Sequence, residues 1–301
     1  MARRLSIFAA DLFALNPWAR AIGETLSALD RALIQPDARR LRMMRNACRT
    51  RLAGGRTVWN HWAADMAALR DACVGPAAAR VWAALALCEQ RFEGFARTFD
   101  ASGFQFPNGA DFTGAHFADE AWFVGARFEA AARFDECAFG RSAYFERGHF
   151  EGPAIFADTE FDGAAQFRGA RFADLARFTH TRFEADAWFS GARFDGAAAF
   201  GACGFEGEAG FGEARFAARA DFSEARFGAN AGFEAARFAK EAVFAGAAIV
   251  KGAFFTDAEF QARPDFKRAR FHGRARFEGA VSPTPSPAML QLAELRRRIE
   301  G

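Results

Sequence analysis

Phenylalanine recurs along most of the chain with a period that is neither helical nor simply alternating. From Phe112 to Phe277, large apolar residues stand at alternating intervals of five and six residues; of these 31 positions, 30 are Phe and one is Ile249. Two residues before each stands a small residue, which is Ala in 25 cases. Helices repeat every 3.6 residues and strands every two, so neither period explains this spacing.

The spacing is explained by short extended segments joined by corners. Residues i−2 and i of an extended segment point to the same side, so each unit would place one ring and one small side chain inward. The residues between, rich in Gly, Arg, Asp and Glu, would face water and form the corners. Such a chain winds into a coil whose like residues stack along the axis. The pattern therefore predicts a mainly β fold, a solenoid with a Phe interior.

The exceptions to Ala indicate the length of one coil. Cys137, Thr159, Thr181 and Cys203 follow one another at intervals of 22 residues, as one column of inward residues would. A coil of about 22 residues has four sides of five, six, five and six residues, whereas a three-sided coil would scramble this column. Residues 112–277 then form about seven and a half coils, and the rod is about 36 Å long at ~4.8 Å per coil.

The repeat resembles that of the pentapeptide-repeat family, which places Ala at i−2, Asp or Asn at i−1, and Leu or Phe at i. Ala110-Asp111-Phe112-Thr113-Gly114 and Ala220-Asp221-Phe222-Ser223 match that form. The resemblance covers residues 104–282 and is to the Phe-rich variety with an eleven-residue period. It implies a right-handed quadrilateral β-helix. The best-known members of the family are rods that inhibit DNA gyrase by imitating DNA and dimerise through a C-terminal helix.

The flanking segments read as helical. Residues 1–100 are expected to form an Arg-rich α-helical domain, in which Trp59, Trp62, Met66, Leu69 and Cys73 make one stripe of a third helix after Gly54-Gly55. Residues 283–301 read as a stiff Pro-rich linker and a short C-terminal helix. That helix either caps the last coil or pairs with a partner. The helical domain would cover the first coil, whose open end exposes unpaired backbone.

The charge distribution and the cysteines narrow the classes of protein to which this chain can belong. The net charge is +2, but residues 1–100 carry 15 Arg against nine acids, while residues 101–282 carry 21 basic and 26 acidic residues. Five cysteines without a CxxC pair favour free thiols in a reducing cytosol, and no zinc site is expected. With no long apolar stretch and no recognisable signal peptide, a cytoplasmic protein is expected.

An Arg-rich helix over residues 37–56 is one candidate site. Its candidate anion contacts are Arg39, Arg42, Arg45 and Arg49. These side chains could bind nucleic acid phosphates or an anionic membrane surface. A solvated helix face, or contact with the acidic rod, is the more ordinary explanation.

The 22-residue period also assembles outward columns. One reads Trp122, Tyr144, Gln166, Trp188, Gly210, Gly232, Phe254, Arg276. Its aromatic members, Trp122, Tyr144, Trp188 and Phe254, form a candidate partner face for a protein or a carbohydrate. Contact with the N-terminal domain, or rod dimerisation, would explain them equally well. A second column contains Arg171, Arg193, Arg215 and Arg237, which either pair with acids in a zwitterionic ladder or form an anion-binding strip.

The sequence offers little for catalysis. The five His are scattered, no phosphate-binding loop is present, and a Phe-filled rod leaves no pocket, so neither enzymatic activity nor a cofactor is expected. We expect a non-catalytic interaction or scaffold rod whose partner is another protein, with homodimerisation as an option. The alternatives are a DNA-mimic regulator of gyrase, for which the rod's charge is weak, and anion, nucleic-acid or membrane-surface binding through the Arg-rich helix.

Overall fold

The computed structural model describes residues 54–72, 94–95, 98–107 and 109–284, and the chain divides into two units, residues 1–91 and 92–301. In the first unit, helix α4 spans Gly55–Ala72 and confirms the third predicted helix, although it begins at Gly55 itself and ends one residue before Cys73. Trp59 and Ala63, four residues apart on one face of α4, are both buried. The other predicted helices of residues 1–100 and the C-terminal helix lie outside the described residues.

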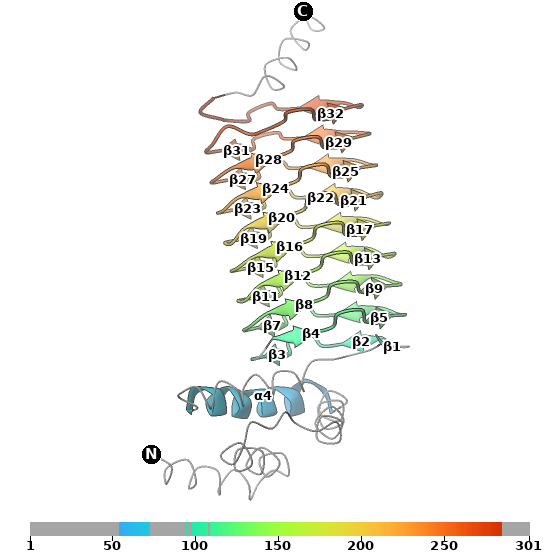
Figure 1. Ribbon diagram of the computed structural model, residues 1–301, viewed down its shortest axis with the longest axis vertical. Coiled ribbons are helices and arrows are strands. Elements are labelled where there is room, and N and C mark those ends of the chain that lie inside the picture. The colour runs from blue at the N-terminus through green and yellow to red at the C-terminus, as the bar shows by residue number, and fades with distance from the viewer. Residues whose placement is uncertain (1–53, 73–93, 96–97, 108, 285–301) are drawn as a thin grey trace, which may run out of the picture. The chain divides into compact units, whose positions relative to one another are not determined.

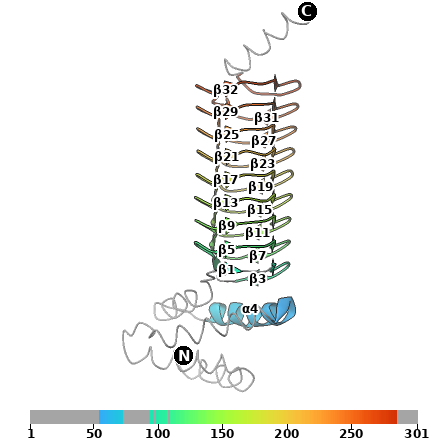
Figure 2. The ribbon, with the colours of Figure 1, turned by 90° about the vertical axis from the view of Figure 1, so that its right-hand side faces the viewer.

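The second unit is a mainly β, parallel solenoid made of four sheets of very short strands (Figures 1 and 2). Sheet A consists of β1 (Gly94–Phe95), β5 (His116–Phe117), β9 (Ala138–Phe139), β13 (Glu160–Phe161), β17 (Arg182–Phe183), β21 (Gly204–Phe205), β25 (Arg226–Phe227), β29 (Ala248–Ile249) and β32 (Arg270–Phe271). Sheet B consists of β2 (Phe99–Asp100), β6 (Ala121–Trp122), β10 (Ala143–Tyr144), β14 (Ala165–Gln166), β18 (Ala187–Trp188), β22 (Ala209–Gly210), β26 (Ala231–Gly232), β30 (Ala253–Phe254) and β33 (Ala275–Arg276).

The other two sheets complete each turn. Sheet C consists of β3 (Gln105–Phe106), β7 (Arg127–Phe128), β11 (His149–Phe150), β15 (Arg171–Phe172), β19 (Arg193–Phe194), β23 (Arg215–Phe216), β27 (Arg237–Phe238) and β31 (Glu259–Phe260). Sheet D consists of β4 (Ala110–Asp111), β8 (Ala132–Arg133), β12 (Ala154–Ile155), β16 (Ala176–Arg177), β20 (Ala198–Ala199), β24 (Ala220–Asp221) and β28 (Ala242–Val243). Because the chain visits the sheets in the order A, B, C, D, sheets B and D belong to opposite sides of a turn.

The register of the sheets confirms the predicted coil length. Each strand pairs in parallel with the strand 22 residues along, as Tyr144 does with Gln166 and Phe150 with Phe172. The solenoid has about eight turns. It also begins before residue 104, because β1 and β2 pair with β5 and β6 although their residues fall in the segment expected to be helical. The right-handed sense implied by the family resemblance stays a prediction.

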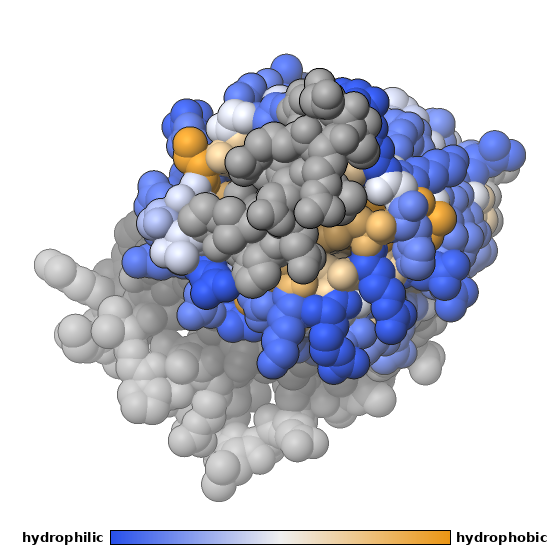
Figure 3. Space-filling view, turned by 90° about the horizontal axis from the view of Figure 1, so that it is seen from above, coloured by the Kyte–Doolittle hydropathy of each residue, from blue (hydrophilic) through white to orange (hydrophobic). Residues whose placement is uncertain are grey.

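The Phe side chains fill the interior as the spacing predicts. In mid-rod, both the Phe and the small residue two positions earlier are buried, as in Ala187 and Phe189. Phe145 stacks on Phe167, one turn away, with ring centroids 4.8 Å apart and planes 1° apart. Across the turn it meets Phe134 of the opposite sheet edge-to-face at 5.3 Å. Seen along the axis from the C-terminal side, the rim is mostly hydrophilic and hydrophobic residues lie nearer the centre (Figure 3).

The inward column of Cys and Thr has a structural explanation. The hydroxyls of Thr159 and Thr181 and the thiols of Cys137 and Cys203 each donate to a backbone carbonyl 25 residues earlier, in the preceding turn. These buried polar groups are thereby satisfied. Burial raises the pKa of the Cys137 thiol to about 12 and raises that of Cys203 as well, because the thiolate would lose its solvation.

Candidate functional site

The predicted aromatic residues lie in a single outward column of sheet B. Trp122 pairs with Tyr144 in register, and the column continues without a slip through Trp188 to Phe254. All four aromatic side chains are half-buried rather than fully exposed. The structure thus brings the four predicted residues to one side of the solenoid, and their role in binding a partner stays a prediction.

The first two members of the column form a compact pair. The rings of Trp122 and Tyr144 are stacked with centroids 4.0 Å apart. The indole N–H of Trp122 donates to Glu120, and the Tyr144 hydroxyl reaches the other oxygen of the same carboxylate at 3.5 Å. The pair is therefore held in a fixed orientation by one carboxylate, with its outer edges open to solvent.

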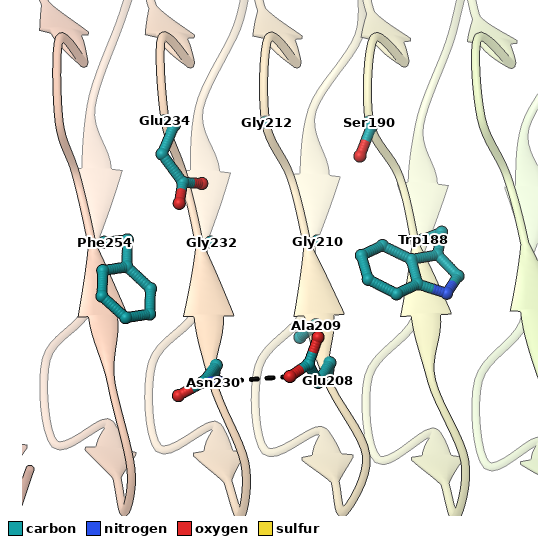
Figure 4. A pocket seen from close by; sticks show the side chains of 10 residues that line it. All are labelled: Trp188, Ser190, Glu208, Ala209, Gly210, Gly212, Asn230, Gly232, Glu234 and Phe254. Atoms are coloured by element: carbon teal, nitrogen blue, oxygen red, sulfur yellow. Dashed lines mark hydrogen bonds between the residues drawn. The ribbon is translucent and has the colours of Figure 1, made fainter.

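The other two aromatic residues bound a groove. The groove between Trp188 and Phe254 encloses about 230 Å³ (Figure 4). Gly210 and Gly232, which follow Trp188 in the column, also line it; the Trp188 ring lies over Gly210, and the Glu234 carboxylate lies over Gly232. The remaining lining residues are the inward Ala209 and, at neighbouring outward positions of the same turns, Ser190, Glu208, Gly212, Asn230 and Glu234.

The groove between Trp188 and Phe254 carries negative charge. Neither Glu208 nor Glu234 forms an ion pair with any residue that the structure describes. Glu208 accepts a hydrogen bond from the amide of Asn230 through one oxygen, which leaves its second oxygen open. A Cβ at Gly232 would lie 2.7 Å from an oxygen of Glu234, so that carboxylate lies over Gly232. Two carboxylates in a half-enclosed space favour a positively charged ligand.

Each of the two aromatic rings lies close to a cation from the neighbouring turn. The guanidinium of Arg168, one turn before Trp188, lies 4.8 Å from the indole centroid. That of Arg276, one turn after Phe254, lies 5.6 Å from the phenyl centroid. Along the axis the order is therefore cation, ring, groove, ring, cation.

The predicted Arg column lies on sheet C and is partly paired. Arg171, Arg193, Arg215 and Arg237 are consecutive in register and all exposed. Arg171 forms a salt bridge with Asp195 at 2.9 Å, and Arg237 forms one with Glu259 at 3.2 Å. The column is thus partly the zwitterionic ladder that the spacing predicts.

Arg193 and Arg215 differ from their neighbours. Within the described part of the chain, neither forms an ion pair. The reason is local: Arg171 reaches the acid 24 residues ahead, but the corresponding positions for these two are Ala217 and Ala239. Two adjacent guanidinium groups are therefore left without an acidic partner at the middle of sheet C.

The remaining candidate sites are the Arg-rich segment, a metal site and a membrane-spanning helix. Arg39, Arg42, Arg45 and Arg49 lie outside the described residues. Among the residues that the structure covers, no group of three or more His, Cys, Asp or Glu is placed to hold a metal ion. No helix in that part of the chain is long and apolar enough to span a membrane.

The groove itself was missed by reasoning from sequence. The sequence shows the two glycines of the column, but it does not show that a groove forms beside them. Reading the columns two residues before and two residues after Gly210 and Gly232 would have found Glu208 and Glu234 beside them. The sequence does not predict the direction of the Trp188 ring. In the structure the ring lies over Gly210, where a Cβ would overlap its Cε3 atom.

Comparison with known proteins agrees with the geometry of the rod. The family model described as pentapeptide repeats (9 copies) matches residues 101–149, 145–193, 156–204 and 189–237. No curated protein and no solved structure matches the chain. The similarity therefore concerns the repeat unit and carries no partner with it.

Proposed function

Because its solenoid is built from pentapeptide repeats, we propose that this protein is a non-catalytic protein-interaction rod. It presents sheet B to a partner protein. The observation that carries the proposal is the column of half-buried aromatic side chains on that sheet, with the groove between Trp188 and Phe254 in its middle. Trp and Tyr dominate the binding energy of protein interfaces because each buries a large area with few rotatable bonds.

The interior supports an interaction role more than a catalytic one. The Phe ladders pack the axis of the rod, so an active site would have to be built on the outside of the turns. The groove is lined by aromatic, glycine, alanine, amide, hydroxyl and carboxylate residues, without a His, Cys or Lys. They can bind and orient a ligand, but they offer no paired nucleophile and base.

A DNA mimic receives less support from the surface. Imitating a duplex requires a dense negative surface, with one charge per about 1.7 Å of axis. On sheet C, Arg171 and Arg237 are neutralised by acids, while Arg193 and Arg215 are not, so one whole side of the solenoid is positive or neutral. Binding of phosphates or membranes through residues 37–56 stays a separate hypothesis.

Photo-crosslinking tests which side of the rod a partner contacts. A benzophenone amino acid replaces Tyr144 on sheet B or, as the matched control, Arg177 on sheet D of the full-length protein, in lysate of the source organism. We expect a specific crosslinked protein from position 144, insensitive to nuclease and absent from position 177. It should be weakened when Trp122 is changed to Ala in the same chain, because Trp122 lies beside position 144 in the aromatic column of sheet B.

Two results would overturn the proposal. Equal crosslinking from positions 144 and 177 would mean that sheet B is not the binding surface. Loss of the product on nuclease treatment would move the function to nucleic acid. Inhibition of gyrase supercoiling by micromolar protein would instead favour the DNA mimic, and it is measured with the gyrase of the same organism.

A further inference from the structure

The last strand of sheet A, β32, has one edge that no described strand covers. It lies at the C-terminal end of the stack of turns (Figure 1). In sheet A, outward residues donate their backbone N–H groups to carbonyls of the preceding turn, as Arg270 does to Ala247. In the last turn, the carbonyls of Ala269 and Phe271 accept no such bond from any residue that the structure describes. An open edge of this kind is a template for another extended chain.

The interior beside this edge is open as well. In mid-rod, a ring such as Phe183 is stacked between the rings of the two adjacent turns and has no exposed surface. Phe271 contacts the rings of Phe266 and Phe277 on the adjacent sides of its own turn and is half-exposed. An added strand could therefore place an apolar side chain inward, on the uncovered face of Phe271.

The last turn is positively charged, in contrast to the rest of the solenoid. Residues 101–262 contain 15 basic and 24 acidic residues, whereas residues 263–284 contain six basic and two acidic ones. Residues 267–274, which include β32, contain no acid. Their four cations are exposed and form no ion pair within the described part of the chain: Lys267, Arg268, Arg270 and Arg274. The charge at this edge therefore favours an acidic partner.

The same charge disfavours the two other chains that could cover the edge. Two copies of the protein meeting at these ends would bring two positive rims together. Residues 285–301 of the same chain contain three Arg and two Glu, so they would add positive charge to the rim. An acidic chain from another protein is attracted where these two are repelled.

We propose that the open edge of β32 binds an acidic, extended segment of another protein as a further parallel strand of sheet A. Because side chains alternate along a strand, apolar residues of this segment pack inward on Phe271, and acidic residues point outward beside Arg270 and Arg274. The outward residues donate their N–H groups to the carbonyls of Ala269 and Phe271, as Arg270 donates to the preceding turn. This site lies outside the aromatic column of sheet B and goes beyond the function proposed for that column.

Binding is measured with a defined peptide on the full-length protein. The probe is Glu-Val-Glu-Phe-Glu-Val-Glu with blocked ends and an uncharged fluorophore, and the readout is fluorescence anisotropy. We expect saturable binding that weakens as salt is raised. A probe with Gln in place of every Glu should bind about tenfold more weakly, because several charge pairs are lost together. Equal binding of the two probes would overturn the proposal.

N-methylation of the probe distinguishes strand pairing from attraction between charges alone. Methylating the nitrogens of the two Glu residues beside Phe removes the donors to Ala269 and Phe271 and should abolish binding. Methylating the two Val nitrogens is the matched control, because these N–H groups point to the opposite edge of the added strand, and binding should be retained. If the two methylated probes bind alike, the edge selects negative charge without a strand, as an anionic membrane surface would, and the proposal is wrong.

Variants of the protein place the probe at β32. Arg270→Gln combined with Arg274→Gln removes two charges from the edge and should weaken binding about fivefold. Arg193→Gln combined with Arg215→Gln removes two charges from the middle of sheet C and, as the matched control, should leave binding unchanged. Equal weakening by both pairs would show that the probe responds to the overall charge of the protein and not to this edge.

Failure of the acidic probe to bind would also overturn the proposal, and sedimentation velocity of the full-length protein would then indicate why. A dimer would mean that a second copy covers the edge, and a monomer would mean that residues 285–301 cover it or that nothing pairs with it. These results are independent of crosslinking at position 144. A specific product there without peptide binding leaves the proposed use of sheet B intact, and peptide binding without such a product leaves only the site at β32.

Discussion

At the residue scale, the corners of the coil impose a cost that only some residues avoid. Most turns have two residues with a left-handed backbone conformation. Gly169 (φ 64°) and Ala235 (φ 54°) occupy the same one of these two positions, three turns apart. Glycine adopts this conformation freely, whereas a residue with a Cβ loses roughly 1–2 kcal/mol. Ala, Glu, Asp, His and Arg also occupy these positions, because the packed interior on either side holds the backbone in place.

Replacing Ala235 by Gly should therefore stabilise the rod. Relief of the backbone strain exceeds the greater entropy of Gly in the unfolded chain, so the free energy of unfolding should rise by roughly 0.5–1 kcal/mol. Urea denaturation followed by circular dichroism measures it. Ala197→Gly is the matched control, because Ala197 is an exposed corner residue without a positive φ and should lose stability. Destabilisation by both substitutions would contradict the argument.

The buried thiols make a second prediction at this scale. Cys137 and Cys203 are each 1% exposed, and burial holds the pKa of both well above the ordinary value of 9.0. Iodoacetamide at mildly alkaline pH should not modify either residue in the native protein and should modify both after denaturation. Peptide mass spectrometry distinguishes them from the other three cysteines. Native modification of Cys203 would mean that its turn opens.

These thiols also make stability depend on pH in a known direction. In the unfolded chain they ionise near their ordinary value, whereas in the folded chain the raised pKa keeps them neutral. Stability is therefore fully present below pH 9.0 and falls as pH rises from there towards about 12, the folded value for Cys137. Changing both cysteines to Thr should flatten this part of the stability curve, because Thr159 and Thr181 make the same hydrogen bond without titrating.

At the scale of single elements, each strand contributes two residues and almost no stability of its own. A strand is stabilised mainly by the stacking of its Phe ring on the rings of the neighbouring turns. Phe183 follows Arg182 in β17 and stacks on Phe161 at 5.1 Å and on Phe205 at 4.8 Å, with no exposed surface. Rings of the two adjacent turns therefore form the floor and the ceiling of its site.

Phe183→Ala should consequently be among the most damaging substitutions in the rod. It leaves a ring-sized cavity between two flat neighbours that cannot close in, and the expected loss is about 3–5 kcal/mol. Thermal and urea denaturation measure it. Phe271→Ala is the control, because Phe271 lies half-exposed in the last turn and should lose much less. A small effect at Phe183 would mean that neighbouring turns can collapse into the gap.

At the scale of the whole rod, the interior and the surface repeat with different periods. The inward pattern of Ala and Phe repeats every half-turn, whereas the outward columns repeat only every full turn. A deletion of one full turn preserves every column. A deletion of half a turn preserves the interior but moves all later sheet B residues to sheet D.

Deletion of residues 156–177, one turn, should give a folded protein that still contacts its partner through sheet B. Deletion of residues 167–177, half a turn, should fold equally well but separate Tyr144 from Trp188 on opposite sides. Since stability in repeat proteins is a sum over neighbouring units, both deletions should lower it modestly. Circular dichroism tests the folding, and crosslinking from position 144 tests the surface. Partner capture by the half-turn deletion at the normal level would show that the continuous column is unnecessary.

The sequence alone determined the interior of this protein. Each ring packs chiefly against a ring one turn away, so a strictly local period specifies the four sheets, the coil length and the columns that face outward. The aromatic column of Trp122 and Tyr144 and the Arg column of sheet C follow from the same arithmetic, as does helix α4 from its apolar stripe.

The groove was decided only by tertiary structure. It exists because Trp188 leans over Gly210, because Phe254 stands beyond Gly232, and because Glu208 and Glu234 reach the same space from neighbouring turns. Which Arg is paired likewise depends on how far a side chain reaches along the axis, as Arg171 does to Asp195 and Arg193 does not. Side-chain direction and reach are set by the volume left by residues far away in sequence, and a periodic pattern carries no information about that volume.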